Sequence, residues 1–328
     1  MAKCVLPEDS GWDFCPNSGA AVLFTVLYGL CMFVHLFLAV KTKKRFCWVI
    51  IMGCTWLTVG FALRTKAAHR ITGSADFIPQ YLIIFLGPLW LNGFVYMVMG
   101  RMVHMLLKRD RLYHISARRL TLIFVILDII SFLVQAASSG PMNSDDLDSV
   151  QIGIYIMMAG VGLQQACILF FVGLAVRFHY KLILATRNAQ GHRMEDDHLC
   201  RNLDSDSDDN ATVKSVIYTV PWRRLLYALY LTLVLISIRN IFRLFEFYDG
   251  ADGYISVHEA FFYSLDALPI FAGLIVLAVV HPSCVLHGPG SEFPAKEKKQ
   301  KGKGAKRRWM RSKSKNGEDG EAGQSLES

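Results

Sequence analysis

The sequence predicts an all-α, polytopic membrane protein with seven transmembrane helices, its N-terminus outside and its C-terminus in the cytoplasm. Of its 328 residues, 53% are hydrophobic and only 19% are charged, and the mean hydropathy is +0.33. Soluble globular domains rarely have this composition. Apolar runs of about 20 residues, long enough to cross the hydrocarbon core of a bilayer, recur along most of the chain. The connecting segments alternate between basic and acidic, which indicates how the helices are oriented.

Seven apolar runs are expected to span the membrane. They lie at residues 20–40, 46–63, 77–100, 120–138, 152–176, 224–241 and 260–280. The second and the fourth are near the lower limit of spanning length. The first is longer than the apolar region of a signal peptide and no small-residue cleavage site follows it, which favours a retained helix.

The orientation follows from lysine and arginine in the short connections. "KTKKR" at 41–45 and the segment at 101–119 are basic, whereas the segments at 138–149 and 244–259 are acidic. The connection at 64–77 disagrees, because it carries three basic residues in a position that is expected to lie outside.

The expected organisation is a short extracellular segment over 1–19, a seven-helix membrane domain over 20–283 and a basic, disordered cytoplasmic tail over 284–328. The net charge of +8 is concentrated where a cytoplasmic leaflet would lie, so it does not indicate nucleic-acid binding. The polybasic stretch at 296–315 is suited either to anionic lipid or to a solubilising tail.

Few other features between the spans suggest chemistry. The long connection at 177–223 is acidic and is expected to be a disordered cytoplasmic loop, in which Ser205 and Ser207 are possible phosphorylation sites. On the external side, Cys4 and Cys15 are a possible disulfide pair.

The remaining cysteines and the membrane histidines give no sign of a metal site. The cysteines have no metal-ligand spacing, and those inside helices are interpreted as small buried residues. His35 and His281 are interpreted as hydrogen-bonded helix residues rather than ligands. We therefore expect neither a metal ion nor a cofactor.

Polar side chains within the spans are the main candidates for a translocation path, because such groups are costly in lipid and usually line a protein interior or a water-filled route. Asp128 and Gln135 lie on one stripe of the fourth span. Gln164 follows the small residues "AGVG" in the fifth span, and Asn92 and Tyr96 share a face of the third.

Two charged stripes are expected to meet at the outer face. Each has the spacing i, i+4 and i+7, and the two stripes are Arg239, Arg243 and Glu246 in the sixth span and Glu259, Tyr263 and Asp266 in the seventh. An unpaired charge at this depth costs several kcal/mol, so the arginines of one stripe should neutralise the carboxylates of the other. Such pairs either hold the helix ends together or form a vestibule for a charged head group.

The segment between these two stripes resembles a calcium-binding loop only in part. With Glu259 as position 12, positions 1 and 3 are Tyr248 and Gly250, which supply no carboxylate. "DGADG" is therefore interpreted as a glycine-rich turn between two membrane helices.

Four stretches together resemble the fungal RTA-like proteins, the lipid-translocating exporter family. The first is "RNIFRLFEFYDGADGYISVHEAFFYSLDALPIFAGLIVLAVVHPS" at 239–283, with several polar positions at fixed spacing and a closing HP pair. The others are "GPLWLNGFVYMVMGRMV" at 87–103, "LDIISFLVQAASSG" at 127–140 and "GVGLQQ" at 160–165. The resemblance covers roughly residues 18–287.

This resemblance implies a seven-span plasma-membrane protein linked to resistance to toxic lipids or drugs. The implied activity is outward movement of amphiphilic lipids, such as sphingoid long-chain bases or phospholipids, so the expected partners are membrane lipids and an amphiphilic small molecule. No catalytic residue or cofactor is implied. The sequence contains no GxxxxGK[ST] motif for direct use of ATP.

The main alternative is a seven-helix receptor or sensor of lipid or drug stress that signals through its cytoplasmic loops. Its topology fits, but the third span ends "GRMVH" without an acidic–arginine pair. A metal-dependent lipid hydrolase would need converging histidines and a carboxylate, yet His35, His258 and His281 are assigned to different depths. A retinal protein would need a lysine within a span.

Overall fold

The computed structural model describes residues 15–69, 74–106, 111–112, 115–142, 144, 146–199, 221–250 and 253–286. Its helices are α1 (Ser18–Thr42), η1 (Arg45–Cys47), α2 (Trp48–His69), α3 (Ser74–Leu106), α4 (Ala117–Met142), α5 (Leu147–Leu199), α7 (Trp222–Asp249), α8 (Tyr254–Val257), α9 (Glu259–Phe261), the π-helix η2 (Phe262–Ala267), α10 (Leu268–Val279) and η3 (Pro282–Cys284). Two short strands, β1 (Arg111–Leu112) and β2 (Ile115–Ser116), pair antiparallel between α3 and α4.

Within these residues, seven helical segments are long and apolar enough to cross a membrane, which confirms the predicted all-α fold with seven spans. They are Ser18–Thr42, Arg45–His69, Pro79–Leu106, Arg118–Met142, Leu147–Leu184, Trp222–Asp249 and Glu259–Cys284. The second and fourth spans are not short, since each has 25 residues. Hydropathy marks only the part of a helix that lies in hydrocarbon, whereas these helices continue into their polar ends.

The segment after the fifth span also differs from the expectation. It was expected to be a loop from residue 177, but α5 continues as a helix to Leu199. Adding a residue to an existing helix is favourable, and no proline interrupts the chain between 177 and 199. Ser205 and Ser207 lie outside the described residues, as does the tail beyond 286.

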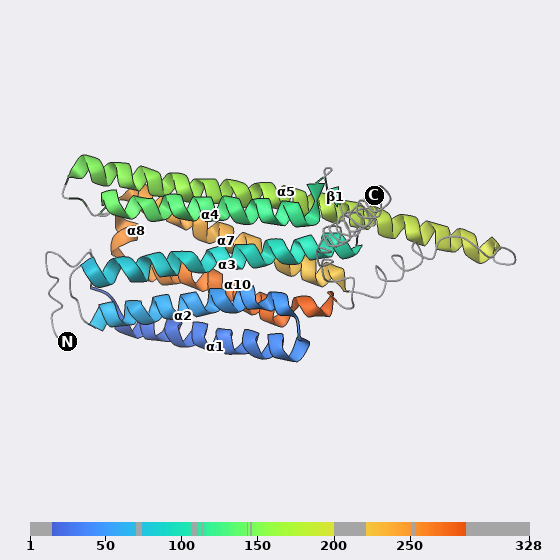
Figure 1. Ribbon diagram of the computed structural model, residues 1–328, viewed down its shortest axis with the longest axis horizontal. Helices are drawn as coiled ribbons and strands as arrows, with labels where there is room; N and C mark the ends of the chain where they lie inside the picture. Colours follow the sequence, from blue (N-terminus) through green and yellow to red (C-terminus); the bar gives the residue numbers. More distant parts are fainter. Residues whose placement is uncertain are drawn as a thin grey trace, which may run out of the picture. The chain divides into compact units, whose positions relative to one another are not determined.

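The helices form a ring in which neighbours in sequence pack side by side from α1 to α5. The ring continues from α5 to α7 and from α7 to α10, and α10 returns to α1. Helix α3 also contacts α5 and α7, and Figure 1 shows it running between the α1–α2 and α4–α5 pairs. Polar residues on α3 are therefore in position to meet several other helices.

A close approach of α4 to α5 depends on one glycine in "AGVG". A Cβ atom on Gly160 would lie 2.7 Å from the Gln135 side chain and 3.1 Å from the Ser131 carbonyl oxygen. Gly162 has nothing within 4 Å. The predicted role of small residues in helix packing therefore applies to Gly160 and not to Gly162.

Helix ends are fixed by local hydrogen bonds. The Asn17 side chain accepts from the backbone N–H groups of Gly19 and Ala20 at 3.0 and 3.2 Å and so caps α1. Asp146 caps α5 in the same way by accepting from the backbone N–H and hydroxyl of Ser149. These bonds to Ser149 lower the pKa of Asp146, because they stabilise its ionised form.

The segment after α7 is a turn held by its own polar groups. Gly250 has a φ of +80°, a left-handed conformation that favours glycine. The Ser256 hydroxyl donates to the Gly250 carbonyl at 2.8 Å, and the Ile255 backbone N–H donates to Asp249 at 3.3 Å. Glu259, the supposed twelfth calcium ligand, is bonded to an arginine instead.

Candidate functional site

The seventh span changes its helical winding where it carries its polar residues. The π-helix η2 begins directly after α9 and includes Tyr263 and Asp266. At its end the Ala267 carbonyl accepts a hydrogen bond of 2.7 Å from the Tyr28 hydroxyl of α1. Single π-turns inside helices often occur at functional sites, and this one accompanies the contact of Asp266 with α7.

Asp266 is the centre of a buried ionic cluster. One of its oxygens, Oδ1, forms an ion pair with Arg239 Nε at 2.8 Å and accepts a hydrogen bond from Arg243 Nε at 2.9 Å. Arg243 also pairs with Glu246 at 2.8 Å. The two guanidinium groups lie 5.2 and 4.6 Å from the centre of the Phe85 ring. Two positive and two negative charges therefore neutralise one another, and the predicted pairing across the two stripes is observed at Asp266.

Glu259 pairs with a residue outside the two predicted stripes. Its Oε1 lies 2.8 Å from Arg64 Nη2 of α2, and its Oε2 accepts from the Asn17 backbone N–H at 2.6 Å. Arg64 also donates to the Tyr263 hydroxyl at 3.2 Å. Arg64 belongs to α2 and not to the connection predicted at 64–77. It directly follows the apolar run at 46–63, which is the sequence signal that places it in the helix.

Side-chain amides extend this polarity toward α4 and α5. Asn240 accepts from Arg239 at 3.3 Å and donates to Gln165 at 3.3 Å. Gln135 of α4 donates to Gln164 of α5 at 3.2 Å. The predicted path residues Gln135 and Gln164 are thus hydrogen-bonded to each other across the α4–α5 contact.

Asp128 has different surroundings from the other three carboxylates. It lies near the middle of the span formed by α4 and is 1% exposed. The Asn92 amide and Tyr96 hydroxyl of α3, both fully buried, are its polar neighbours. Among the described residues, none of these three side-chain groups completes a hydrogen bond of ordinary length and angle. The structure thus brings together three predicted path residues and leaves their polar atoms unsatisfied.

A narrow pocket adjoins this trio between α3, α4 and α5. It has about 310 Å³ of empty space, including its open side, and Tyr96 is part of its wall. The wall is formed mainly by apolar side chains, namely Tyr96, Met99, Gly100, Val103, Leu120, Thr121, Phe171, Leu174, Ala175 and Phe178. Sequence reasoning identified Tyr96 but missed the apolar wall, because the residues of three helices form it.

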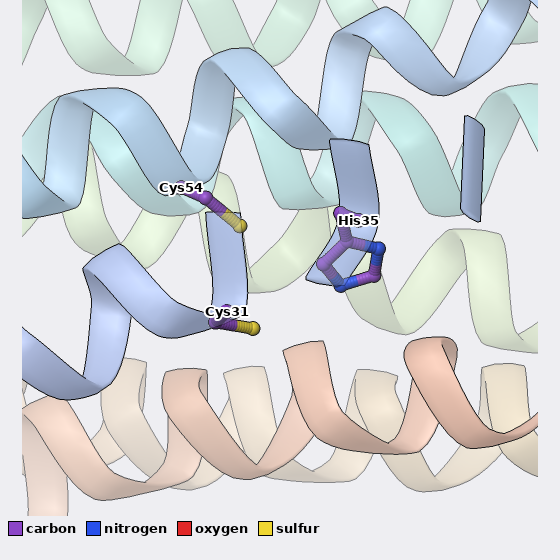
Figure 2. A group of neighbouring side chains, drawn as sticks. All are labelled: Cys31, His35 and Cys54. Carbon is purple, nitrogen blue, oxygen red and sulfur yellow. The ribbon is translucent and has the colours of Figure 1, made fainter. Parts of the chain in front are cut away.

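A second group of buried side chains joins α1 to α2. The ligand atoms of Cys31, His35 and Cys54 lie within 4.8 Å of one another, and Figure 2 shows the two thiols and the imidazole gathered between these helices. His35 also makes the expected hydrogen bond, at 3.1 Å to the Leu274 carbonyl. The i, i+4 spacing of Cys31 and His35 was visible in the sequence, whereas the approach of Cys54 was not.

Of the predicted disulfide pair, one cysteine lies among the described residues. Cys15 is disulfide-bonded, whereas Cys4, its predicted partner, lies outside the described residues. The identity of the partner stays a prediction.

Comparison with known proteins agrees with the resemblance in sequence. The family model described as RTA1 like protein matches residues 50–289. A probable lipid transporter, atnI, of Emericella nidulans is 35% identical over 86% of this chain and 70% of its own length. Protein RTA1 of Saccharomyces cerevisiae is 30% identical over 83% of this chain and 84% of its own length.

A sphingoid long-chain base transporter, RSB1, of Saccharomyces cerevisiae is 23% identical over 85% of this chain and 75% of its own length. No solved structure matches the chain. The match to the family model covers most of the chain and includes the α7–α10 segment that carries the ionic cluster. The chain belongs to the RTA1-like protein family.

Proposed function

We propose that this protein moves cationic amphiphilic lipids of the sphingoid-base type across a membrane, and that Asp128 binds the cationic head group. Relatives named as a probable lipid transporter and as a sphingoid long-chain base transporter support a lipid-related transport role for the family. The observation that carries the proposal is that Asp128 is buried at bilayer depth with no basic partner among the described residues, and that its polar neighbours there are the uncharged side chains of Asn92 and Tyr96.

The four acidic candidates differ in whether they are already neutralised. Asp266, Glu246 and Glu259 each lie 2.8–2.9 Å from an arginine nitrogen, so an incoming cation would have to displace that arginine. Asp128 needs no such exchange. A charged side chain at the centre of a membrane helix costs about 3 kcal/mol on insertion scales, and pairing with an ammonium group offsets part of this cost. Asp128 is therefore the favoured head-group site.

The adjoining pocket offers a place for the alkyl chain. Its wall is mainly apolar and includes Tyr96, which also faces Asp128. A cation held by the carboxylate would thus have its chain between α3, α4 and α5, with Asn92 and Tyr96 available to bond head-group hydroxyls. Because the pocket is narrow, we infer that these helices separate when a chain enters.

For the outer ionic cluster we propose a structural role. Its charges cancel within the cluster, and the ion pairs of Asp266 with Arg239 and Arg243 connect the seventh span to α7. Of the two alternatives raised by the sequence, the one in which pairs hold helix ends together fits this geometry better than a vestibule for a head group.

The proposal is tested with purified protein in lipid vesicles and a fluorescent sphingoid base. We expect exchange between leaflets above that of empty vesicles, and we expect Asp128→Asn to reduce it at least about tenfold, which corresponds to 1.4 kcal/mol of lost interaction. The matched control is Asp148→Asn, which changes an exposed carboxylate at the start of α5. An uncharged N-acyl analogue of the same chain length should be insensitive to Asp128→Asn.

Two results would contradict the proposal. If exchange equals that of empty vesicles under every ion and lipid gradient, the protein is not a translocator. Saturable binding of the base in that case would favour the receptor alternative. If exchange occurs but Asp128→Asn leaves it unchanged, translocation stands and the head-group assignment fails.

The predicted location and orientation belong to the same proposal. We place the protein in the plasma membrane, as the family resemblance implies. The lysine and arginine distribution supports an orientation with residues 1–19 outside and residues 284–328, including the polybasic stretch, in the cytoplasm. Three basic residues in the connection at 64–77 disagreed with this orientation. One of them, Arg64, is paired with Glu259 and does not belong to the loop. Epitope tags at each end, probed with antibody on intact and permeabilised cells, test both statements. Staining of a C-terminal tag on intact cells would reverse the orientation.

A further inference from the structure

We propose that Cys31, His35 and Cys54 form a binding site for one Cu(I) ion between α1 and α2. Their ligand atoms lie within 4.8 Å of one another, and the residues are 2%, 1% and 0% exposed. Neither the proposed transport path nor the ionic cluster uses these side chains. Three side chains of types that can bind metals thus come from two helices and meet at one buried place.

The ligand types indicate a soft metal ion. Thiolates select Cu(I) and zinc over magnesium, calcium and manganese, and imidazole suits both of the selected ions. Metal–sulfur distances near 2.3 Å and metal–nitrogen distances near 2.0 Å would require the three ligand atoms to draw together by no more than roughly 1 Å. Since all three are side-chain atoms on neighbouring helix faces, rotamer changes can supply this movement.

Coordination number favours Cu(I) over Zn²⁺. Structural Zn²⁺ sites in proteins are almost always tetrahedral with four protein ligands. Among the described residues, the group has no fourth His, Cys, Asp or Glu ligand. Cu(I) is stable with three ligands, so the triad is complete for Cu(I) and incomplete for Zn²⁺.

Binding requires both cysteines to ionise, because the thiolate and not the thiol is the metal ligand. Each of the two thiols gives up its proton as the ion enters, and the imidazole binds in its neutral form. Cu(I) binding should therefore release about two protons per ion.

His35 connects the site to a third helix. Its Nε2 lies 3.1 Å from the Leu274 carbonyl oxygen of α10, which can only accept a hydrogen bond. The neutral ring therefore donates from Nε2 and keeps its lone pair on Nδ1, the nitrogen that we assign as the ligand once the ring turns toward the thiols. A ligating histidine is commonly oriented by a carbonyl in this way. Bound Cu(I) would then tie α1 to α2 and fix the position of α1 against α10.

The test uses the full chain, reduced and purified in detergent without oxygen, with Cu(I) supplied through a competing chromophoric chelator. We expect the wild type to take about one ion per chain from the chelator and to unfold at a higher temperature with the ion bound. Cys31→Ser, Cys54→Ser and His35→Gln should each weaken binding at least about tenfold. A zinc arm under the same conditions should show weaker uptake.

The matched controls change similar groups elsewhere. Cys47 lies 3.7 Å from His281, so Cys47→Ser removes a thiol from another buried Cys–His contact. Cys167→Ser removes a buried thiol from α5. Both variants should bind Cu(I) as the wild type does, and circular dichroism of each variant before metal is added separates loss of ligation from loss of fold.

Three results would overturn the site. The first is no uptake by the folded, reduced wild type, and the second is equal loss of binding in Cys47→Ser. The third is stronger uptake of zinc than of Cu(I). Asp128→Asn should keep normal Cu(I) binding, so failure of this inference and failure of the proposed transport function are distinguishable.

Discussion

Arg64 and Glu259 form an ion pair between the second and seventh spans, with Nη2 and Oε1 2.8 Å apart and side chains that are 4% and 10% exposed. The Asn17 backbone N–H binds the second oxygen of Glu259 at 2.6 Å. The start of α1, the end of α2 and the start of α9 are therefore connected through one carboxylate. Mutation of the two residues can therefore measure how much the pair contributes to the free energy of unfolding.

Removing both partners of this pair should cost less stability than the sum of the two single removals. Arg64→Ala and Glu259→Ala should each lower the apparent free energy of unfolding by about 3 kcal/mol, because each leaves a buried charge without its partner. The double variant should cost less than the sum of the two. Denaturation in mixed micelles measures all three variants.

The control for this cycle combines Glu246→Gln with Glu259→Gln. These carboxylates pair with different arginines, so their interaction energy should be smaller than that of Arg64 and Glu259. Lys41→Ala, at the exposed end of α1, should change stability little. Additive effects of Arg64→Ala and Glu259→Ala would contradict a direct interaction.

Asp266→Asn should be among the most damaging single substitutions. It removes the carboxylate that Arg239 and Arg243 share at 2.8 and 2.9 Å, so that Glu246 is the carboxylate left to pair with the two buried guanidinium groups among the described residues. We expect a loss of at least about 3 kcal/mol or failure to fold. Asp266→Asn combined with Arg239→Gln should recover part of the yield of folded protein, measured by size-exclusion chromatography. No recovery would mean that charge balance is not the cause.

The two glycines of "AGVG" should respond differently to alanine. Gly160→Ala places a methyl group 2.7 Å from Gln135 and 3.1 Å from the Ser131 carbonyl oxygen, so α4 and α5 must separate. Overpacking of this kind costs about 1–3 kcal/mol. Gly162→Ala meets nothing within 4 Å and should be neutral or slightly stabilising. Thermal unfolding compares the two, and equal effects would argue against the close α4–α5 contact.

Filling the apolar pocket should slow the exchange of long-chain bases more than that of short-chain bases. Ala175 is 1% exposed and lines the pocket, whereas its neighbour Val176 is 54% exposed on the same helix. Ala175→Phe should slow exchange of a long-chain base several-fold more than exchange of a short-chain base, because the phenyl ring occupies the space proposed for the chain. Val176→Phe should leave both rates near those of the wild type. Equal rates for Ala175→Phe and Val176→Phe would place the chain elsewhere.

Several features could be predicted from local sequence because they depend on neighbouring residues. The seven spans follow from lengths of apolar sequence, and the stripes of Arg239, Arg243 and Asp266 follow from helical periodicity. The turn at Gly250 follows from glycine and aspartate in a short connection. The predicted ends of the second and fourth spans and of α5 were less accurate, because helices continue after the hydropathy of the sequence falls.

The amino-acid sequence alone is enough to identify a seven-helix membrane protein of the RTA1-like family and the polar residues within its spans. The partners of those residues depend on the tertiary structure. Arg64 and Glu259 are 195 positions apart, and Cys54 reaches Cys31 from another helix. Which side chains meet depends on how each helix is rotated and how closely it packs, as at Gly160. Those variables are set by the whole bundle, so they left Asp266 paired and Asp128 without a basic partner among the described residues.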